Sequence, residues 1–329
     1  MAPPSLLVTV DAGADRRRVI AEELPPEVEC RFLDDVEPDR RGDAVAAADA
    51  ILTLVPHREL TAAAFERLHE GQVLQTVSAG VDHLPLDRLP EGVVLCNNAG
   101  AYAEPMAEHV LALYLALAKR LLVEHRKLQA GEFDQFHPNR RVAGSTCAIF
   151  GFGAIGEATA RLLRPLGVEV LAVNRSGESD AADLVDFLGT PDDLADVLPR
   201  CDGLVVAAPL TPETRGVIDR EKLEWMPEDA MLINVARGEL VVQRDLYEHL
   251  NANPEFQAGV EAWWTEPIRH GEFDLEYPLL DLPNVLGCPH NSAQVPGVHE
   301  AGMRRAVRNV VRGLNTGEYE RRVDVERGY

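Results

Sequence analysis

The stretch Thr146-Cys-Ala-Ile-Phe-Gly151-Phe-Gly153-Ala-Ile-Gly156 decides the fold of this chain. Its first five residues are mostly apolar and predict a buried strand, which runs directly into the pattern G-x-G-x-x-G. Small and apolar residues behind the last glycine predict a helix. A strand, a glycine turn and a helix in this order predict the dinucleotide-binding turn of a Rossmann unit.

Each glycine has its own task in such a turn. Gly151 permits the tight turn, Gly153 lets the backbone approach a pyrophosphate, and Gly156 allows the helix to pack closely on the strand. Ala154 and Ile155 open the helix, whose N-terminus attracts anions. We therefore expect these five residues to bind a coenzyme.

The next predicted strand ends in Val173-Asn174-Arg175-Ser176-Gly177, about 20 residues further on. A carboxylate here would bind a ribose 2'-hydroxyl, whereas Arg175 can pair with a 2'-phosphate and Ser176 can donate to it. We therefore expect Asn174, Arg175 and Ser176 to bind NADP(H) in preference to NAD(H). NAD(H) remains the alternative coenzyme. A solvated Arg175 stacked on the adenine is the other interpretation.

Strands alternate with helices along nearly the whole chain, which predicts parallel sheets with helices on both faces. The fold class we expect is α/β, with two doubly wound parallel-sheet domains: a Rossmann dinucleotide-binding domain and a flavodoxin-like substrate domain. The expected strands are Leu6 to Val10, Ala50 to Val55, Val73 to Val77, Val93 to Cys96, Cys147 to Phe150, Glu169 to Val173, Gly203 to Ala207, Met231 to Val235, Ala258 to Ala262 and Val285 to Gly287.

Two domains also suit the length of 329 residues. A long helix expected over about 104–129 should connect them, and the series that begins at Thr146 suits a nucleotide domain. We therefore assign residues 101–290 to the NAD(P)-binding domain. Residues 1–100 and 291–329 form the substrate domain, because the C-terminal helix of about 297–314 has to pack on the first domain.

Composition excludes several classes of protein. The formal net charge of −22 disfavours nucleic-acid binding. The most apolar helical run, 106–118, is shorter than the roughly 20 residues of a membrane span, and the N-terminus lacks the basic start of a signal peptide. Five widely spaced cysteines suggest neither a metal site nor disulfides. We expect a soluble cytoplasmic protein.

The acidic surface has two open explanations. The chain has only three lysines, Lys119, Lys127 and Lys222, and such a surface stays hydrated in strong salt. Compositional drift in a GC-rich genome explains the same counts. Activity and melting temperature measured from low to molar salt would separate the two, because a flat response excludes salt adaptation.

Further motifs carry a resemblance to a known family. They are Ser78-Ala79-Gly80-Val81-Asp82-His83-Leu84, Pro209-Leu-Thr-Pro-Glu-Thr214, Ile233-Asn-Val-Ala-Arg237-Gly238-Glu-Leu-Val241, Thr265-Glu266-Pro267 and Pro289-His290-Asn-Ser-Ala293. With the glycine pattern, in this order and over nearly the whole chain, they resemble the D-isomer-specific 2-hydroxyacid dehydrogenases, in particular their glyoxylate/hydroxypyruvate reductase-like members.

The resemblance implies NAD(P)H-dependent reduction of a small 2-oxo acid to the D-2-hydroxy acid, and the reverse. It implies that Arg237 grips the substrate's carboxylate and carbonyl oxygen, and that His290 is the general acid and base. Glu266 would pair with the imidazole and raise its pKa. Backbone N–H groups of Ala79 and Gly80 would bind the substrate carboxylate, and the cleft between the domains would close on it.

The resemblance also implies further coenzyme contacts, from Ala208, Pro209, Thr214, Val235, Ala236, Glu261 and, again, Arg237 and His290. Glu261 departs from the family, which usually has aspartate there, and its side chain is one methylene longer. Trp263 and Trp264 form either a substrate wall or core packing, and we favour packing. Candidates for the pocket lining are His57, Tyr102 and Trp264.

Other functions share this scaffold. One is a dinucleotide-sensing corepressor, which the complete set of three catalytic residues disfavours. Formate or phosphite oxidation is another, but a formate enzyme should have glutamine in place of Glu266, and a phosphite enzyme a basic residue in the loop at Ser78 and Ala79. The apolar helix of 106–122 and the loop of 131–136 resemble the family's dimer surface, so we expect a homodimer.

Overall fold

Two parallel sheets organise the chain, which a computed structural model describes over residues 3–329, the side chain of residue 57 excepted. Unit 1 contains the residues up to Tyr102 together with Val295–Tyr329, and unit 2 is Ala103–Gln294. The boundaries expected from the sequence, after residues 100 and 290, lie a few residues before these.

The sheet of unit 1 has the strand order β2-β1-β3-β4-β5, and each described neighbouring pair is parallel. This is the order of the flavodoxin-like fold, as expected. Its strands are β1 (Ser5–Val8), β2 (Glu29–Phe32), β3 (Ala50–Thr53), β4 (Val73–Thr76) and β5 (Val94–Cys96), and its helices are α1 (Ala14–Glu23), α2 (Arg41–Ala47), α3 (Pro56–Glu59), α4 (Ala62–Phe65) and α12 (Val298–Thr316).

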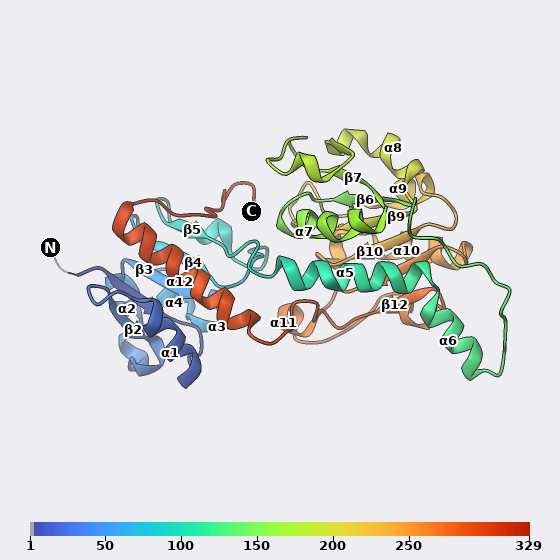
Figure 1. The fold of residues 1–329 in the computed structure, drawn as a ribbon. Helices are drawn as coiled ribbons and strands as arrows, with labels where there is room; N and C mark the ends of the chain where they lie inside the picture. The colour runs from blue at the N-terminus through green and yellow to red at the C-terminus, as the bar shows by residue number, and fades with distance from the viewer. Residues whose placement is uncertain (1–2) are drawn as a thin grey trace. The chain divides into compact units, whose positions relative to one another are not determined.

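The C-terminal helix completes one face of unit 1. Successive residues of a strand point to opposite faces, so Leu6 belongs to the same buried cluster as Met303 and Val307 of α12, whereas Leu7 packs with Phe65 on the other face. Helix α12 lies beside α1 and against β3 and β4 (Figure 1). Unit 1 is therefore built from two separate segments of the chain.

The sheet of unit 2 has the order β12-β11-β10-β9-β6-β7-β8 with parallel pairs throughout the described strands, which is the Rossmann arrangement with one additional strand. Its strands are β6 (Thr146–Phe150), β7 (Glu169–Val173), β8 (Phe187–Gly189), β9 (Gly203–Val206), β10 (Met231–Asn234), β11 (Gln257–Val260) and β12 (Val285–Gly287). Its helices are α5 (Ala103–Ala118), α6 (Leu121–Gln129), α7 (Ala154–Leu163), α8 (Leu194–Val197), α9 (Arg220–Trp225), α10 (Gln243–Ala252) and α11 (Pro267–His270).

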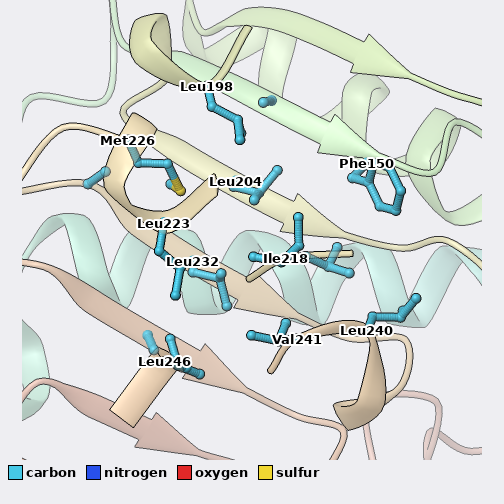
Figure 2. Close-up of a cluster of buried hydrophobic side chains, with 14 of the residues drawn as sticks. Phe150, Leu198, Leu204, Ile218, Leu223, Met226, Leu232, Leu240, Val241 and Leu246 are labelled. Atoms are coloured by element: carbon cyan, nitrogen blue, oxygen red, sulfur yellow. The ribbon is translucent and has the colours of Figure 1, made fainter. Parts of the chain in front are cut away.

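Helices cover both faces of this sheet, which explains why its central strands are apolar at nearly every position. Ile149 of β6 packs in the cluster formed with α5 and α7. The next residue, Phe150, points into the opposite cluster, where Leu232 of β10 meets Leu223 and Leu246 of the helices α9 and α10 (Figure 2). Two packed layers thus hold the carboxyl ends of the strands in place.

The helix expected over 104–129 is broken into α5 and α6. Arg120, between them, has a left-handed backbone (φ 52°), and its buried guanidinium pairs with Glu124 and with Glu255 at 2.7 Å. The pairing of Arg120 with Glu255, which lies far away in the sequence, cannot be read from the spacing of apolar residues. The sequence therefore predicted one continuous helix. Within the described chain, no helix is both long and apolar enough to cross a membrane.

Two strands, β2 and β8, are not among those expected from the sequence. Both lie at a sheet edge, where one side of the strand has no neighbour. Their residues are correspondingly less buried, and β2 alternates exposed with half-buried positions. Strand β2 lacks the continuous apolar run that identified the central strands, because it contains Glu29 and Arg31, and β8 is only three residues long.

Candidate active site

The glycine turn after β6 lies where the strand order of unit 2 reverses, between β6 and β9. Gly151 has φ 104°, and a Cβ at this position would lie 2.3 Å from the backbone nitrogen of Ala208. The backbones of the turn after β6 and of the loop after β9 therefore come so close that no side chain fits at Gly151. Ligands of doubly wound sheets bind at such a reversal point.

The other two glycines of the turn, Gly156 and Gly153, differ in the space around them. A Cβ at Gly156 would lie 2.5 Å from the carbonyl oxygen of Gly151, so a side chain would force α7 away from the turn. At Gly153, the residue before the first turn of α7, a Cβ would have no atom of the described residues within 4 Å. Open space before the N-terminus of α7 suits a pyrophosphate, so these residues fit the nicotinamide coenzyme that the sequence predicts.

The loop after β7 is folded by the side chain of Asn174. Its oxygen accepts hydrogen bonds from the backbone N–H groups of Ser176 at 3.1 Å and Gly177 at 2.7 Å, and its nitrogen donates to the carbonyl of Glu178. Arg175 and Ser176 are exposed on this turn. Asn174 thus shapes the turn, while the two residues after it are accessible to a ligand.

The loop after β9 contains Ala208, Pro209 and Thr214. Ala208 is buried against the glycine turn. The hydroxyl of Thr214 donates to the carbonyl of Pro209 at 2.7 Å and accepts from the N–H of Thr211 at 2.8 Å. These bonds hold the predicted coenzyme residues of this loop in one compact turn.

Asn234, the buried last residue of β10, folds the segment that carries Arg237. Its side-chain oxygen accepts from the N–H of Ala236 at 3.1 Å, and its nitrogen donates to the carbonyl of Arg237 at 2.8 Å. Val235 and Ala236 are buried between them, and Arg237 is half-buried. The guanidinium of Arg237 donates to the carbonyl of Ala236 at 2.8 Å.

The next residue, Gly238, brings two loops into direct contact. A Cβ there would lie 2.4 Å from the backbone carbon of Trp263, in the loop after β11. A two-pronged ion pair between Glu239 and Arg269, at 2.8 and 3.0 Å, joins the same two loops. The loop of Arg237 and the loop that leads to Glu266 are therefore held together.

Glu266 and His290 form the hydrogen-bonded pair that the sequence motifs suggest. The imidazole Nδ1 of His290 lies 2.8 Å from the carboxylate of Glu266, which also accepts from the N–H of Trp263 at 2.7 Å. Glu266 is only 6% exposed, while the histidine is partly open to solvent. The carboxylate orients the ring, which leaves Nε2 as the nitrogen that can serve a ligand.

Charge sets the protonation state of Glu266. Its burial by itself would raise the pKa of the carboxyl group. The hydrogen bond and the charge of His290, the N–H of Trp263 and the charge of Arg237 outweigh burial and hold the pKa of Glu266 below its usual value. Glu266 is therefore a carboxylate that is hydrogen-bonded to a histidine and acted on by the charge of an arginine, a combination suited to proton transfer.

The two tryptophans that the sequence offers for a substrate wall donate their indole N–H groups to backbone carbonyls of unit 2. Trp263 is buried and its indole N–H donates to the carbonyl of Cys288, so packing is the right interpretation. Trp264 donates to the carbonyl of Val241 and lines a groove of about 750 Å³, whose described lining residues include neither Arg237 nor His290.

The predicted substrate loop of unit 1 follows β4. Thr76 donates to the carbonyl of Ser78 at 2.8 Å, Ser78 donates to the carbonyl of Gly80 at 3.1 Å, and Asn98 donates to that of Val77. Ala79 and Gly80 are half-buried in this braced turn. Tyr102 also donates to the carbonyl of Val77, and the side chain of His57 lies outside the described residues.

Sequence reasoning missed the residues that hold the others in place. Asn234, Gly238 and the ion pair of Glu239 with Arg269 act on backbone or on distant partners. Asn234 and Gly238 do stand inside the motif around Arg237, so a polar residue at a strand end was the one available signal.

Comparisons with known proteins agree with this geometry. The family described as D-isomer specific 2-hydroxyacid dehydrogenase, NAD binding domain, matches residues 111–292. The human glyoxylate reductase/hydroxypyruvate reductase is 30% identical over 322 residues, 94% of each chain. A glyoxylate reductase of Thermococcus kodakarensis is 28% identical and covers 88% of this chain and 83% of its own.

A solved structure is similar over the whole chain. It is a D-isomer specific 2-hydroxyacid dehydrogenase from Xanthobacter autotrophicus Py2 in complex with NADPH and MES. The two chains align with a TM-score of 0.83 at 27% identity, and the alignment covers 100% of both.

The glycine turn allows a matched pair of substitutions. Gly156→Ala should lower the free energy of unfolding by about 1–3 kcal/mol, because the new methyl group collides with the backbone of Gly151. Gly153→Ala meets open space, so it should keep its stability and lose affinity for the coenzyme. Denaturant melts and coenzyme titrations measure both effects, and equal stability of the two variants would contradict this account.

The lowered pKa of Glu266 predicts a pH-dependent contribution to stability. A carboxyl group whose pKa is lower in the folded chain stabilises the fold fully above its usual pKa, and this contribution is lost as the pH falls to the folded-state value. Glu266→Gln should therefore be less stable than the wild type at neutral pH, and the difference should shrink in acid. Urea melts from about pH 7 to about pH 3 measure it; a difference that grows in acid would refute the sign.

Proposed function

This chain belongs to the D-isomer specific 2-hydroxyacid dehydrogenase family and is an NAD(P)-dependent oxidoreductase, and we propose that it reduces small 2-oxo acids to D-2-hydroxy acids. The observation that carries the proposal is the 2.8 Å pair of His290 and Glu266, with the charge of Arg237 acting on the same carboxylate. The three groups suit a reaction in which a carbonyl oxygen gains a proton.

Each residue has a defined task in this proposal. The bound coenzyme supplies the hydride. Arg237 pairs with the substrate's carboxylate and polarises its carbonyl oxygen. His290 gives the proton on Nε2 to that oxygen, and takes it back in the oxidative direction. Glu266 accepts from Nδ1, so it keeps the ring in the right orientation and stabilises the imidazolium.

The names of the related enzymes favour a small substrate. Both the human and the Thermococcus proteins are named for glyoxylate reduction, and the human one also for hydroxypyruvate. We therefore propose glyoxylate and hydroxypyruvate as substrates, with Ala79 and Gly80 binding the carboxylate through backbone N–H groups. The pairing of His290 with Glu266, not with a glutamine, favours these acids over formate.

We propose NADP(H) as the preferred coenzyme. Arg175 and Ser176 are exposed on the turn after β7, where Asn174 uses its side chain to fold the loop. An exposed guanidinium suits a 2'-phosphate. The related Xanthobacter structure contains NADPH.

We also propose a homodimer in the cytoplasm, where free cysteines like those of this chain stay reduced. One face of α5 packs on α7 within unit 2, and the helix of 106–122 with the loop of 131–136 remains the contact surface that we propose. Helix α6 and the loop behind it extend from the rest of unit 2 (Figure 1), and Phe133 and Phe136 there are 79% and 86% exposed. A monomer mass in light scattering would overturn the dimer.

His290→Ala should lower kcat by about two or more orders of magnitude, the usual contribution of a general acid. The assay follows NADPH absorbance at about 340 nm with glyoxylate, hydroxypyruvate, pyruvate and longer 2-oxo acids. His69→Ala, at an exposed histidine of unit 1 outside the proposed site and dimer surface, serves as the matched control and should retain the wild-type rate. Turnover of none of these acids by the wild type would refute the proposed function.

Arg175→Asp should reverse the coenzyme preference, since the new carboxylate repels a 2'-phosphate and accepts from a 2'-hydroxyl. The ratio of kcat/KM for NADPH to that for NADH is the measurement. Arg200→Asp makes the same charge change at an exposed position of unit 2 and should leave the ratio as it is. A wild type that prefers NADH would contradict the assignment.

A further inference from the structure

Helix α11, which follows directly on Glu266, has little apolar anchoring of its own. It is four residues long, none of them is buried, and Ile268 is 70% exposed. A single helical turn is not stable by itself, because too few hydrogen bonds offset the ordering of the chain. The position of α11 therefore depends on its bonds to neighbouring loops.

Glu266 shares its backbone with this helix. Its carbonyl accepts from the N–H groups of Arg269 at 3.2 Å and His270 at 2.7 Å, and its own N–H donates to Nδ1 of His270 at 2.9 Å. A displacement of α11 therefore moves Glu266, and with it the carboxylate that lies 2.8 Å from the imidazole of His290.

Arg269 fixes α11 to the turn that carries Arg237. Its guanidinium binds both carboxylate oxygens of Glu239, at 2.8 and 3.0 Å, and the two side chains are only 17% and 14% exposed. A forked and largely buried pair is stronger and better ordered than an exposed one. Glu239 lies shortly after Arg237 and Arg269 shortly after Glu266, so the pair joins the two segments next to both proposed catalytic residues.

Glu239 also binds the loop after β9. Its carbonyl accepts from the N–H of Gly216 at 2.8 Å, and its carboxylate lies 3.9 Å from the guanidinium of Arg215. The strands β9, β10 and β11 are neighbours in the sheet, and Glu239 belongs to the loop after the middle one. This one residue therefore joins the loops that follow all three strands.

A second bond joins the same segments on the other side of Glu266. The indole N–H of Trp264 donates to the carbonyl of Val241 at 2.8 Å. Trp264 precedes Glu266 and Arg269 follows it, so the carboxylate is held from both directions along the chain. Of the two bonds, only the ion pair can be removed by truncating either partner, which makes it the one to test.

We propose that Glu239 and Arg269 are positioning residues that set the distance between Arg237 and the hydrogen-bonded pair of Glu266 and His290. Arg237 has to grip the substrate while His290 protonates the same molecule, so an error of about 1 Å in their separation is costly for the reaction. This inference rests on the proposed function. The ion pair acts on the reaction through the two segments that it joins.

The first test is a double-variant cycle on the full-length protein. Glu239→Ala and Arg269→Ala should each lower kcat for glyoxylate about 10- to 100-fold at saturating coenzyme with little change in KM, because the substrate still binds but is poorly aligned. The double variant should lose no more than either single variant, since each already breaks the pair. Arg269→Lys keeps the charge without the fork, so its kcat should lie between those of the wild type and Arg269→Ala.

The second test needs neither coenzyme nor substrate. Amide hydrogen exchange of the ligand-free protein reports on the bonds around Glu266, which include those of the N–H groups of Trp263, Arg269 and His270. In Glu239→Ala, exchange over residues 263–270 should be about tenfold faster or more, because the segment opens more often.

Glu23→Ala is the matched control. The side chain of Glu23 is 12% exposed and pairs with two arginines, Arg304 and Arg308, where α1 packs on α12 in unit 1. Urea melts should show a loss of stability for Glu23→Ala, as for Glu239→Ala. The control should nevertheless keep the wild-type kcat and the wild-type exchange over residues 263–270.

The outcomes are distinguishable. Wild-type kcat in either alanine variant, losses that multiply in the double variant, or unchanged exchange over residues 263–270 overturns this inference and leaves the proposed function standing. A wild type that reduces none of the 2-oxo acids overturns the proposed function and this inference with it. If the alanine variants fail to fold, Arg269→Lys decides, since wild-type kcat and exchange in that variant would overturn the inference.

Discussion

Parallel strands of one sheet end at the same edge, and every proposed catalytic and coenzyme residue of unit 2 depends on this constraint. Gly151, Ala208, Arg237 and Glu261 follow four different strands, yet the strand order places those strands side by side. The edge becomes a site because the loops leaving it approach one another through bare backbone, at Gly151 and at Gly238.

Buried polar side chains then give this edge its shape. Asn234 and Glu261 fold the two turns that carry Arg237 and His290, and Glu266 orients the imidazole. Such groups are costly to bury unless their hydrogen bonds are made, which is why a satisfied network specifies one arrangement. Within the described chain, the buried Oε2 of Glu261 is the oxygen of this network that lacks a protein partner.

The charges of the proposed site differ from the charge of the whole chain. The charge of the whole chain is strongly negative, but the proposed substrate contacts of unit 2 are an arginine and a histidine. Glu266 stays ionised in spite of its burial, because His290 and Arg237 lower its pKa. The ionised carboxylate of Glu266 therefore faces the imidazole of His290, whose side chain is partly open to solvent.

Local chemistry and periodicity made part of this protein predictable from the sequence alone. Glycines at fixed offsets after an apolar strand define the turn of Gly151 to Gly156, and central strands buried on both faces leave continuous apolar runs. The tertiary structure alone decided what depends on distant partners: the break of the long helix at Arg120, the edge strands β2 and β8, and the use of Asn234 and Glu261 as scaffolds. Hydrogen-bond partners and burial depend on how segments far apart in the chain approach each other. A linear sequence pattern does not say which distant segments will meet.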